Sequence, residues 1–246
     1  MQSMNGPEAA QAPPEGEGEA PLASVVIPAY NESATIEEIL QRVMASPVEK
    51  EVIVVDDGSV DDTAEKAGNW AEQGVRLLRH EKNMGKGAAL STGFRAARGQ
   101  IIIVQDADLE YHPREYEKLL EPIVSGEADV VYGSRFLGGP HRVLFFWHMV
   151  GNRLLTLLSN MLSNLNLTDM ETGYKVMRRE VVERLKLREK RFGVEPEITQ
   201  KVAKGGWRLY EVPISYYGRT YAQGKKIGLK DALWAVWCLL RYRLRD

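Results

Sequence analysis

Cysteine is almost absent from the sequence, and this limits the chemistry that the chain can use. Cys238 is the single cysteine among 246 residues, which excludes an internal disulfide and favours a reducing compartment. The segment 234–240 around it is apolar, as is typical of a packed rather than a reactive thiol. The four histidines show no ligand spacing, so a Cys/His zinc site is not supported.

Net charge and long apolar runs are also lacking. A formal net charge of −2 gives no bulk electrostatic case for nucleic acid as a partner. The longest uncharged run, residues 154–168, is interrupted by serine and asparagine and falls short of the ~20 apolar residues of a membrane span. Lysine and arginine are absent before Arg42, whereas residues 219–245 are markedly basic. The length favours one large domain.

The first 22 residues differ from the rest in composition. They are rich in proline, glycine, alanine and glutamate, and they lack the basic start and apolar stretch of a signal peptide. We expect residues 1–22 to be a disordered lead-in and residues 23–246 to form the folded domain.

Strand and helix patterns alternate along the folded part. Short apolar, β-branched runs predict strands at 24–28, 51–55, 75–78, 101–104, 129–133 and 209–213. Helical patterns lie between the first five, with Asn31 or Ser33 and then Asp61 or Asp62 as candidate N-caps. This alternation predicts an α/β fold: a Rossmann-like, mostly parallel central sheet flanked by helices.

The strand at 101–104 leads directly into two carboxylates, Asp106 and Asp108. A carboxylate left in a core costs several kcal/mol unless it is paired or metal-bound. The strand therefore delivers both side chains to a cleft at its C-terminal end, the edge where open α/β sheets bind ligands. Two such carboxylates suit Mg²⁺ or Mn²⁺ beside a phosphate.

Polar residues follow two other predicted strands, with Asp56 and Asp57 after the second and Ser134 and Arg135 after the fifth. Their coincidence at one sheet edge indicates a site. A dinucleotide-binding fold is disfavoured because Gly-x-Gly-x-x-Gly is missing after the first strand. The glycines around Lys86 do not form a P-loop, because the spacing and the hydroxyl residue after the lysine are missing.

The segment 143–165 is strongly apolar and predicts one or two helices, with a polar but uncharged opposite face. Two interpretations stay open for it. The apolar side packs in the core, or it contacts a lipid interface or lines a groove for a lipid chain.

Seven motifs, taken together and in order, resemble family 2 glycosyltransferases of the GT-A fold, in the branch of dolichyl-phosphate mannose synthases and polyprenyl-phosphate glycosyltransferases. The resemblance covers about residues 23–240. The motifs lie at 25–32 (VVIPAYNE), 54–59 (VVDDGS), 83–87 (NMGKG), 106–108 (DAD), 133–135 (GSR), 169–174 (DMETGY) and 219–226.

This resemblance implies roles for individual residues. The metal ligands would be Asp106, Asp108 and Glu110, and the base and ribose positions Pro28, Tyr30, Asn31, Glu32 and Asp57. Basic residues near the donor and acceptor phosphates would be Lys86, Arg135, Arg219 and Lys226. Asp169 is a candidate base or an organiser of the basic set.

The implied activity is an inverting, metal-dependent sugar transfer from GDP-mannose or a UDP-hexose to a polyprenyl or dolichyl phosphate. Residues 23–135 would hold the nucleotide sugar and residues 136–246 the acceptor. A phosphate nucleophile is already anionic and needs positioning more than deprotonation. We expect a cytoplasmic protein at the cytoplasmic face of a membrane, and the need for a separate membrane partner stays open.

Three alternatives remain. A sugar hydroxyl in polysaccharide or glycolipid synthesis could be the acceptor, and a general base would then be required. A non-catalytic nucleotide-sugar-binding subunit would have the fold without turnover. A haloacid-dehalogenase-like phosphatase also uses Asp-x-Asp, but its motif should close the first strand of the domain, whereas another acidic pair precedes Asp106 here.

Overall fold

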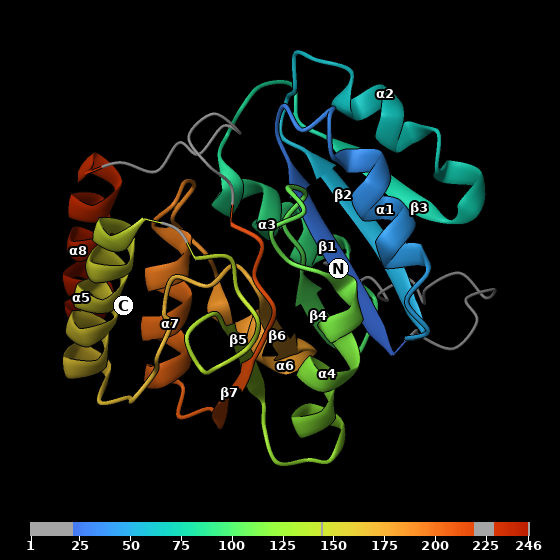
Figure 1. The fold of residues 1–246 in the computed structure, drawn as a ribbon. Coiled ribbons are helices and arrows are strands. Elements are labelled where there is room, and N and C mark those ends of the chain that lie inside the picture. The colour runs from blue at the N-terminus through green and yellow to red at the C-terminus, as the bar shows by residue number, and fades with distance from the viewer. Residues whose placement is uncertain (1–21, 144, 219–228, 246) are drawn as a thin grey trace, which may run out of the picture.

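The computed structural model describes residues 22–143, 145–218 and 229–245. This part of the chain forms one central sheet with helices on both faces (Figure 1). The strand order is β3-β2-β1-β4-β6-β5-β7. The strands are β1 (Ala23–Ala29), β2 (Lys50–Asp56), β3 (Val75–Arg79), β4 (Ile101–Val104), β5 (Val130–Ser134), β6 (Lys175–Arg178) and β7 (Leu209–Pro213). The sheet is parallel except for β6, which confirms the predicted fold class.

The helices are named in chain order in Figure 1. They are α1 (Ile36–Met44), α2 (Thr63–Gly68), α3 (Lys86–Ala96), α4 (Tyr116–Val124), α5 (Phe146–Ser163), α6 (Arg179–Leu185), α7 (Val194–Lys204) and α8 (Leu229–Leu244). Short 3₁₀ turns occur at Ala71–Gln73 and Pro113–Glu115.

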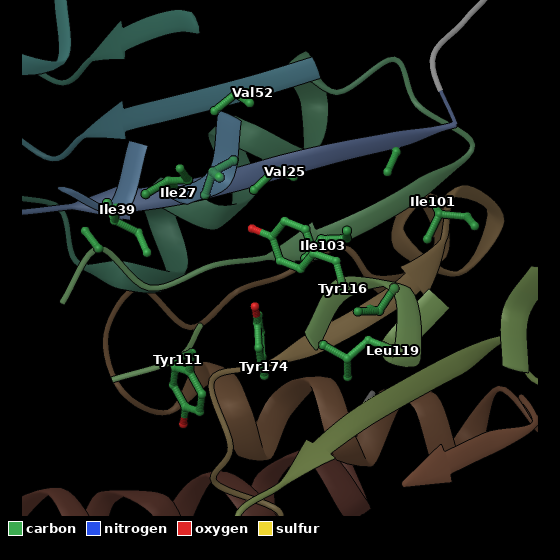
Figure 2. Close-up of a cluster of buried hydrophobic side chains, with 14 of the residues drawn as sticks. Val25, Ile27, Ile39, Val52, Ile101, Ile103, Tyr111, Tyr116, Leu119 and Tyr174 are labelled. Carbon is green, nitrogen blue, oxygen red and sulfur yellow. The ribbon is translucent and has the colours of Figure 1, made fainter. Parts of the chain in front are cut away.

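Alternate residues of the central strands build two cores, one on each face. Val25 and Ile27 of β1 and Ile103 of β4 point to the face covered by α1 and α4, as Figure 2 shows. Val26 of β1 and Ile102 of β4 point to the other face, where α3, α6, α7 and α8 pack. Burial on both faces explains why these strands read as continuous apolar runs rather than as an alternating pattern.

The predicted strand positions are confirmed to within one or two residues, but β6 was not predicted. This strand is antiparallel to both neighbours, β4 and β5. Its first residue, Lys175, therefore lies level with Tyr132 near the C-terminal end of β5. As a result, the loop before β6 reaches the same sheet edge as the loops after β1, β2, β4 and β5.

The capping predictions were partly wrong. Helix α1 has Thr35 as its N-cap residue, with no side-chain cap, so neither Asn31 nor Ser33 caps it. Asp62 is the N-cap residue of α2 but makes no capping bond. The Asp61 carboxylate instead accepts the Thr63 amide at 3.0 Å. Asp61 also accepts the Ser33 amide, and Asn31 accepts the Val60 amide, so side chains of each loop bond to the other loop as well.

Helix α5 buries polar side chains and exposes some of its apolar ones. Its uncharged polar residues Thr156 and Ser159 are buried, while Leu154, Leu157 and Met161 are 61 %, 56 % and 74 % exposed. Thr156 Oγ1 accepts the Met170 amide at 3.2 Å. Core packing is confirmed for the leucines at 155, 158 and 162, which contact the core, but not for the exposed ones. Contact of the exposed side with lipid stays a prediction.

Helix α8 packs against α5 and α7, and the three lie side by side in Figure 1. It also carries exposed apolar side chains: Leu233, Trp237 and Leu244 are 64 %, 52 % and 78 % exposed. Cys238 of α8 is buried, and burial together with Glu189 raises the pKa of its thiol to about 12, which confirms the prediction of a packed cysteine. Among the described residues, no helix is long and apolar enough to cross a membrane.

Candidate active site

A cavity of about 2040 Å³ opens at the C-terminal edge of the sheet. Ten of the predicted site residues line it: Pro28, Tyr30, Asn31, Glu32, Asp57, Lys86, Asp106, Asp108, Glu110 and Arg135. Asp169 is fully buried and is not part of the lining. Arg219 and Lys226 lie outside the described residues, as does the lead-in up to residue 21. The fold thus brings side chains from the ends of β1, β2, β4 and β5 and from the first residue of α3 into one cavity.

Gln105 fixes the main chain at Asp106, because its Nε2 donates to the Asp106 carbonyl oxygen at 3.0 Å. The Gln105 side chain is buried, and its Oε1 accepts the hydroxyls of Tyr116 at 3.0 Å and Tyr174 at 2.9 Å. Both tyrosines belong to the core cluster drawn in Figure 2. A β-carbon at Gly173 would lie 2.2 Å from Asp106 Oδ2, so only glycine allows this turn to pack on the carboxylate. Asp106 is therefore held from two sides.

Lys86 joins two acidic residues that are far apart in the sequence. Its Nζ lies 2.8 Å from Asp106 Oδ1 and 3.0 Å from Glu195 Oε1. Burial alone would lower the pKa of Lys86, but the two carboxylates raise it well above its ordinary value. Lys86 is thus a permanent cation on the cavity wall, at the first residue of α3, where its charge opposes the helix dipole and needs such partners.

The loop after β1 and the loop after β2 fix each other. Asn31, which has a left-handed backbone with φ of 54°, donates its amide to Ser59 Oγ at 3.0 Å. In return, Asn31 Oδ1 accepts the Val60 amide at 3.0 Å. The Glu32 amide donates to Thr63 Oγ1 at 2.8 Å. These contacts shape the wall of the cavity where the resemblance expects a base and ribose.

Asp57 lines the cavity and also accepts hydrogen bonds from other residues of the chain. Its carboxylate accepts the amides of Met84 at 2.9 Å and Gly85 at 2.6 Å, and it contacts His80 Nδ1 at 2.7 Å. Asp57 therefore shapes the turn that presents Lys86. Its expected contact with a nucleoside stays a prediction.

The start of α3 is also held by the loop before α7. The Gly87 amide donates to the Lys190 carbonyl at 2.9 Å, and a β-carbon at Gly87 would lie 2.0 Å from the Glu189 carbonyl oxygen. The buried Glu189 carboxylate accepts from Tyr242 at 2.8 Å and from Trp234 at 3.2 Å, both on α8. This loop connects the C-terminal helix to the turn that carries Lys86.

Arg135 forms a two-pronged ion pair with Asp169. Its Nε donates to Oδ2 at 2.6 Å, a second guanidinium nitrogen donates to Oδ1 at 2.7 Å, and its main-chain amide donates to Oδ2 at 3.1 Å. The Tyr216 ring lies 5.1 Å from the guanidinium. This geometry makes Asp169 an organiser of Arg135, one of the two roles predicted for it.

Asp108 and Glu110 lie on the turn after Asp106. The Glu110 amide donates to Asp108 Oδ1 at 3.2 Å, and the Tyr216 hydroxyl donates to Glu110 Oε2 at 2.9 Å. Within the described residues, no three His, Cys, Asp or Glu side chains gather as a preformed metal cage. Mg²⁺ and Mn²⁺ sites that use one or two carboxylates, with phosphate and water as the other ligands, need no such cage. The pair Asp106 and Asp108 fits such a site.

Two interacting ionisable residues, Lys175 and Glu171, lie behind this turn. Lys175 donates to the main-chain oxygens of Met170 and Thr172, and its ammonium lies 4.3 Å from the centre of the Tyr132 ring. Burial raises the pKa of Glu171, with the negative charge of Glu195 adding to the effect. Glu171 lines the cavity, and its Oε1 is buried and has no hydrogen-bond partner among the described residues.

Glu195 was not among the site residues predicted from the sequence. It lies in the first turn of α7, which brings its carboxylate to Lys86. The only signal was an acidic residue two positions after the Phe-Gly pair at 192–193, which periodicity does not distinguish from an ordinary acidic first turn. The partner of Lys86 could be found only from the fold.

Beside α5 and α8 the cavity is lined by both apolar and charged side chains. The apolar ones, which we call the apolar mouth, are Val143, Phe145, Trp147 and Leu155 from α5 and the loop before it, and Ala235 from α8. Arg142, His148 and Arg153 line the same region. Trp147 is 78 % exposed. The cavity therefore runs from a charged end at Asp106 and Lys86 to an apolar mouth beside the exposed side of α5.

Comparison with known proteins gives concordant matches. The family model described as glycosyl transferase family 2 matches residues 24–186. A dolichol-phosphate mannosyltransferase from Pyrococcus furiosus is 32 % identical over 212 residues, which are 83 % of this chain and 59 % of that protein. A polyprenol monophosphomannose synthase from Mycolicibacterium smegmatis is 31 % identical over 224 residues, 86 % of this chain and 84 % of that protein.

Among solved structures, the fold is similar to glucosyl-3-phosphoglycerate synthase from Mycobacterium tuberculosis, crystallised with Mn²⁺, UDP and phosphoglyceric acid. The TM-score is 0.71 at 24 % identity, over 92 % of this chain and 80 % of that one. At this identity the likeness shows the fold, a GT-A arrangement, and not the substrates. With a family model matching most of the folded part and relatives above 30 % identity over most of the chain, this protein is a member of glycosyl transferase family 2.

Proposed function

We propose that this glycosyltransferase moves a hexose from a nucleotide-sugar donor to the phosphate of a polyprenyl lipid, with inversion and with a divalent cation. The observation that carries the proposal is the form of the cavity, which joins an Asp106/Asp108 carboxylate pair to an apolar mouth. A donor diphosphate suits the carboxylate end, and a lipid chain suits the apolar mouth. Two relatives bear names that specify dolichol or polyprenol phosphate and mannose.

At the charged end, Asp106 and Asp108 would hold Mg²⁺ or Mn²⁺, with Glu110 as a further candidate ligand. The cation would neutralise charge on the departing nucleoside diphosphate. Pro28, Tyr30, Asn31, Glu32 and Asp57 would contact the nucleoside. Lys86, already a cation on the cavity wall, would add positive charge beside the phosphates.

The acceptor phosphate would meet Arg135. Its guanidinium is fixed by Asp169, so it can present its remaining donors to an anion without reorienting. Arg219 and Lys226 would supplement it. Because the phosphate oxygen is already charged, no base is needed, and Asp169 acts by holding Arg135.

The apolar mouth and the exposed sides of α5 and α8 would rest on a membrane surface. Leu157 and Met161 of α5 and Trp237 of α8 offer apolar contact, while Arg241 and Arg243 offer positive charge. Each basic residue near an anionic leaflet contributes about 1 kcal/mol. The site would then take up its lipid at the cytoplasmic face, whether or not a separate membrane partner assists.

The test is a transfer assay with purified protein. GDP-mannose and UDP-glucose, labelled in the sugar, are each offered with Mn²⁺ or Mg²⁺ and vesicles containing polyprenyl phosphate. We expect label in the lipid phase from one donor, as a mild-acid-labile glycosyl phosphate. Label appearing instead in an acid-stable glycolipid or polysaccharide would assign a hydroxyl acceptor. Nucleotide binding without transfer to any acceptor would favour a non-catalytic subunit.

A further inference from the structure

Glu171 is a carboxyl group that the proposed transfer does not yet use. It lies at the cavity wall in the loop between Asp169 and β6, yet its Oε1 is buried and has no hydrogen-bond partner within residues 22–143, 145–218 and 229–245. A buried polar atom without a partner costs about 1–3 kcal/mol, so such atoms are rare unless a ligand completes them. A partner for Glu171 is therefore expected from the contents of the cavity.

The position of Glu171 relates it to the donor end. The turn that follows it packs at Gly173 directly on the Asp106 carboxylate. Glu171 also interacts electrostatically with Glu195, which Lys86 links to Asp106. Glu171, Glu195 and Lys86 thus come from three separate elements and face the same part of the cavity, next to the carboxylates assigned to the diphosphate.

The surroundings of Glu171 favour a neutral partner over an anion. Asp169 and Glu195 are acidic groups that raise its pKa, and Lys175 and Arg135 are basic groups that oppose them. Lys175 is fully buried beneath the loop, and the remaining donors of Arg135 are assigned above to the acceptor phosphate. A phosphate here would lie among three carboxyl groups, whereas a neutral hydroxyl can donate to one and accept from another.

We propose that Glu171 binds a hydroxyl group of the donor hexose, with Glu195 and Lys86 beside it, so that these residues help to select the sugar. This inference rests on the proposed donor chemistry and adds to it the residues that hold the hexose. The hexose follows the diphosphate directly, and Glu171 lies next to the diphosphate end.

The protonation of Glu171 agrees with this role. Burial and the neighbouring Glu195 raise its pKa to about 8, against the opposing charges of Lys175 and Arg135. At neutral pH the carboxyl is then mainly protonated and can both donate and accept a hydrogen bond. A glutamine in its place has the same capacity.

The experiment compares each nucleotide with its sugar-bearing form. Isothermal titration calorimetry with Mn²⁺ measures GDP against GDP-mannose and UDP against UDP-glucose for wild type, Glu171→Ala and Glu171→Gln. We expect Glu171→Ala to weaken binding of the nucleotide sugar about tenfold or more, and to leave the free nucleotide within twofold. Glu171→Gln should retain most of the affinity for the sugar form. The matched control is Glu183→Ala, an exposed glutamate on α6 that should change neither.

Thermal melting separates binding from folding. Removal of a buried, unpaired carboxyl should leave the ligand-free melting temperature of Glu171→Ala equal to or above that of wild type. Three results for Glu171→Ala would each overturn the hexose contact. They are an equal loss of affinity for nucleotide and nucleotide sugar, no loss of affinity for either, and a lowered melting temperature. Wild type that binds none of the four ligands would instead overturn the proposed donor class.

Discussion

Asp169 accepts three hydrogen bonds from the single residue Arg135, two from the guanidinium and one from the main-chain amide, at 2.6 to 3.1 Å. The carboxylate is fully buried, while the arginine reaches the cavity. The aspartate therefore fixes both the backbone and the side chain of the residue proposed to meet the acceptor phosphate.

Arg135→Ala should destabilise the fold and abolish transfer. The variant leaves the buried Asp169 without its cation, which costs about 3–5 kcal/mol. Denaturant unfolding measures this loss. The double variant Arg135→Ala with Asp169→Asn should recover much of the stability but no transfer, because the anion-binding guanidinium is still missing. Restored activity in the double variant would contradict the role of Arg135.

Asp108→Asn should remove the metal dependence of nucleotide binding. Asp106 is then the one carboxylate left of the pair, and it provides too few oxygen ligands to bind Mg²⁺ or Mn²⁺ tightly. We expect affinity for the nucleotide in the presence of Mn²⁺ to fall at least tenfold, to the level that wild type shows in EDTA. The control is Asp62→Asn, an exposed aspartate before α2. Wild-type affinity that is insensitive to EDTA would refute the metal site.

Glu171 should make the protein less stable as pH rises from about 4.5 to about 8. Its pKa is about 8 in the folded chain and 4.5 as its ordinary value, so between these limits the folded state binds the additional proton. The contribution falls by about 1.4 kcal/mol per pH unit in that window. Urea unfolding at pH 5.5 and 7.5 should show this slope reduced in Glu171→Gln relative to wild type. Parallel slopes would argue against the raised pKa.

Glu189→Ala should weaken nucleotide binding from a distance. It leaves the buried Tyr242 hydroxyl unpaired and loosens the loop whose Lys190 carbonyl holds the first amides of α3. We expect a loss of about 1–3 kcal/mol in the free energy of unfolding and a raised KM for the donor with a smaller change in kcat. Tyr242→Phe should shift both quantities in the same direction by less. An unchanged KM in a destabilised Glu189→Ala protein would show that α8 and α3 are independent.

Membrane association should depend on α5 and α8. The double variant Leu157→Glu and Trp237→Glu replaces two exposed apolar side chains with charges, and we expect at least a tenfold loss of binding to anionic vesicles in sedimentation. Val124→Glu changes an equally exposed residue at the end of α4 and should have no effect. Binding by wild type should weaken with added salt, because arginines contribute to it. Equal sedimentation of the two variants would exclude this surface.

The fold could be predicted far better than the contacts in the site. Apolar runs such as 101–104 predict strands because a strand buried on both faces needs apolar side chains throughout. The strand 175–178 was not predicted because it begins with a lysine, which is unusual in a buried strand. The cost of burying Lys175 is offset by main-chain oxygens and the Tyr132 ring, which only the fold brings near.

Most predicted site residues do line one cavity, because the C-terminal ends of parallel strands share an edge. Contacts between site residues that are far apart in the sequence could not be predicted. Lys86 and Glu195 are separated by more than a hundred residues, and Asp169 and Glu171 come before an antiparallel strand rather than after a parallel one. Local pattern carries no information about which distant carboxylate a lysine will meet.

The buried polar side of α5 has a consequence for the shape of the cavity. Thr156 accepts the Met170 amide, and Asn160 exchanges two hydrogen bonds with the main chain of Leu167. These bonds set the rotation of the helix about its own axis. Its exposed leucines cannot turn inward unless these hydrogen bonds break. If positions 156 and 160 were apolar, α5 could rotate about its axis and bury those leucines. The shape of the cavity mouth beside Trp147 would then change.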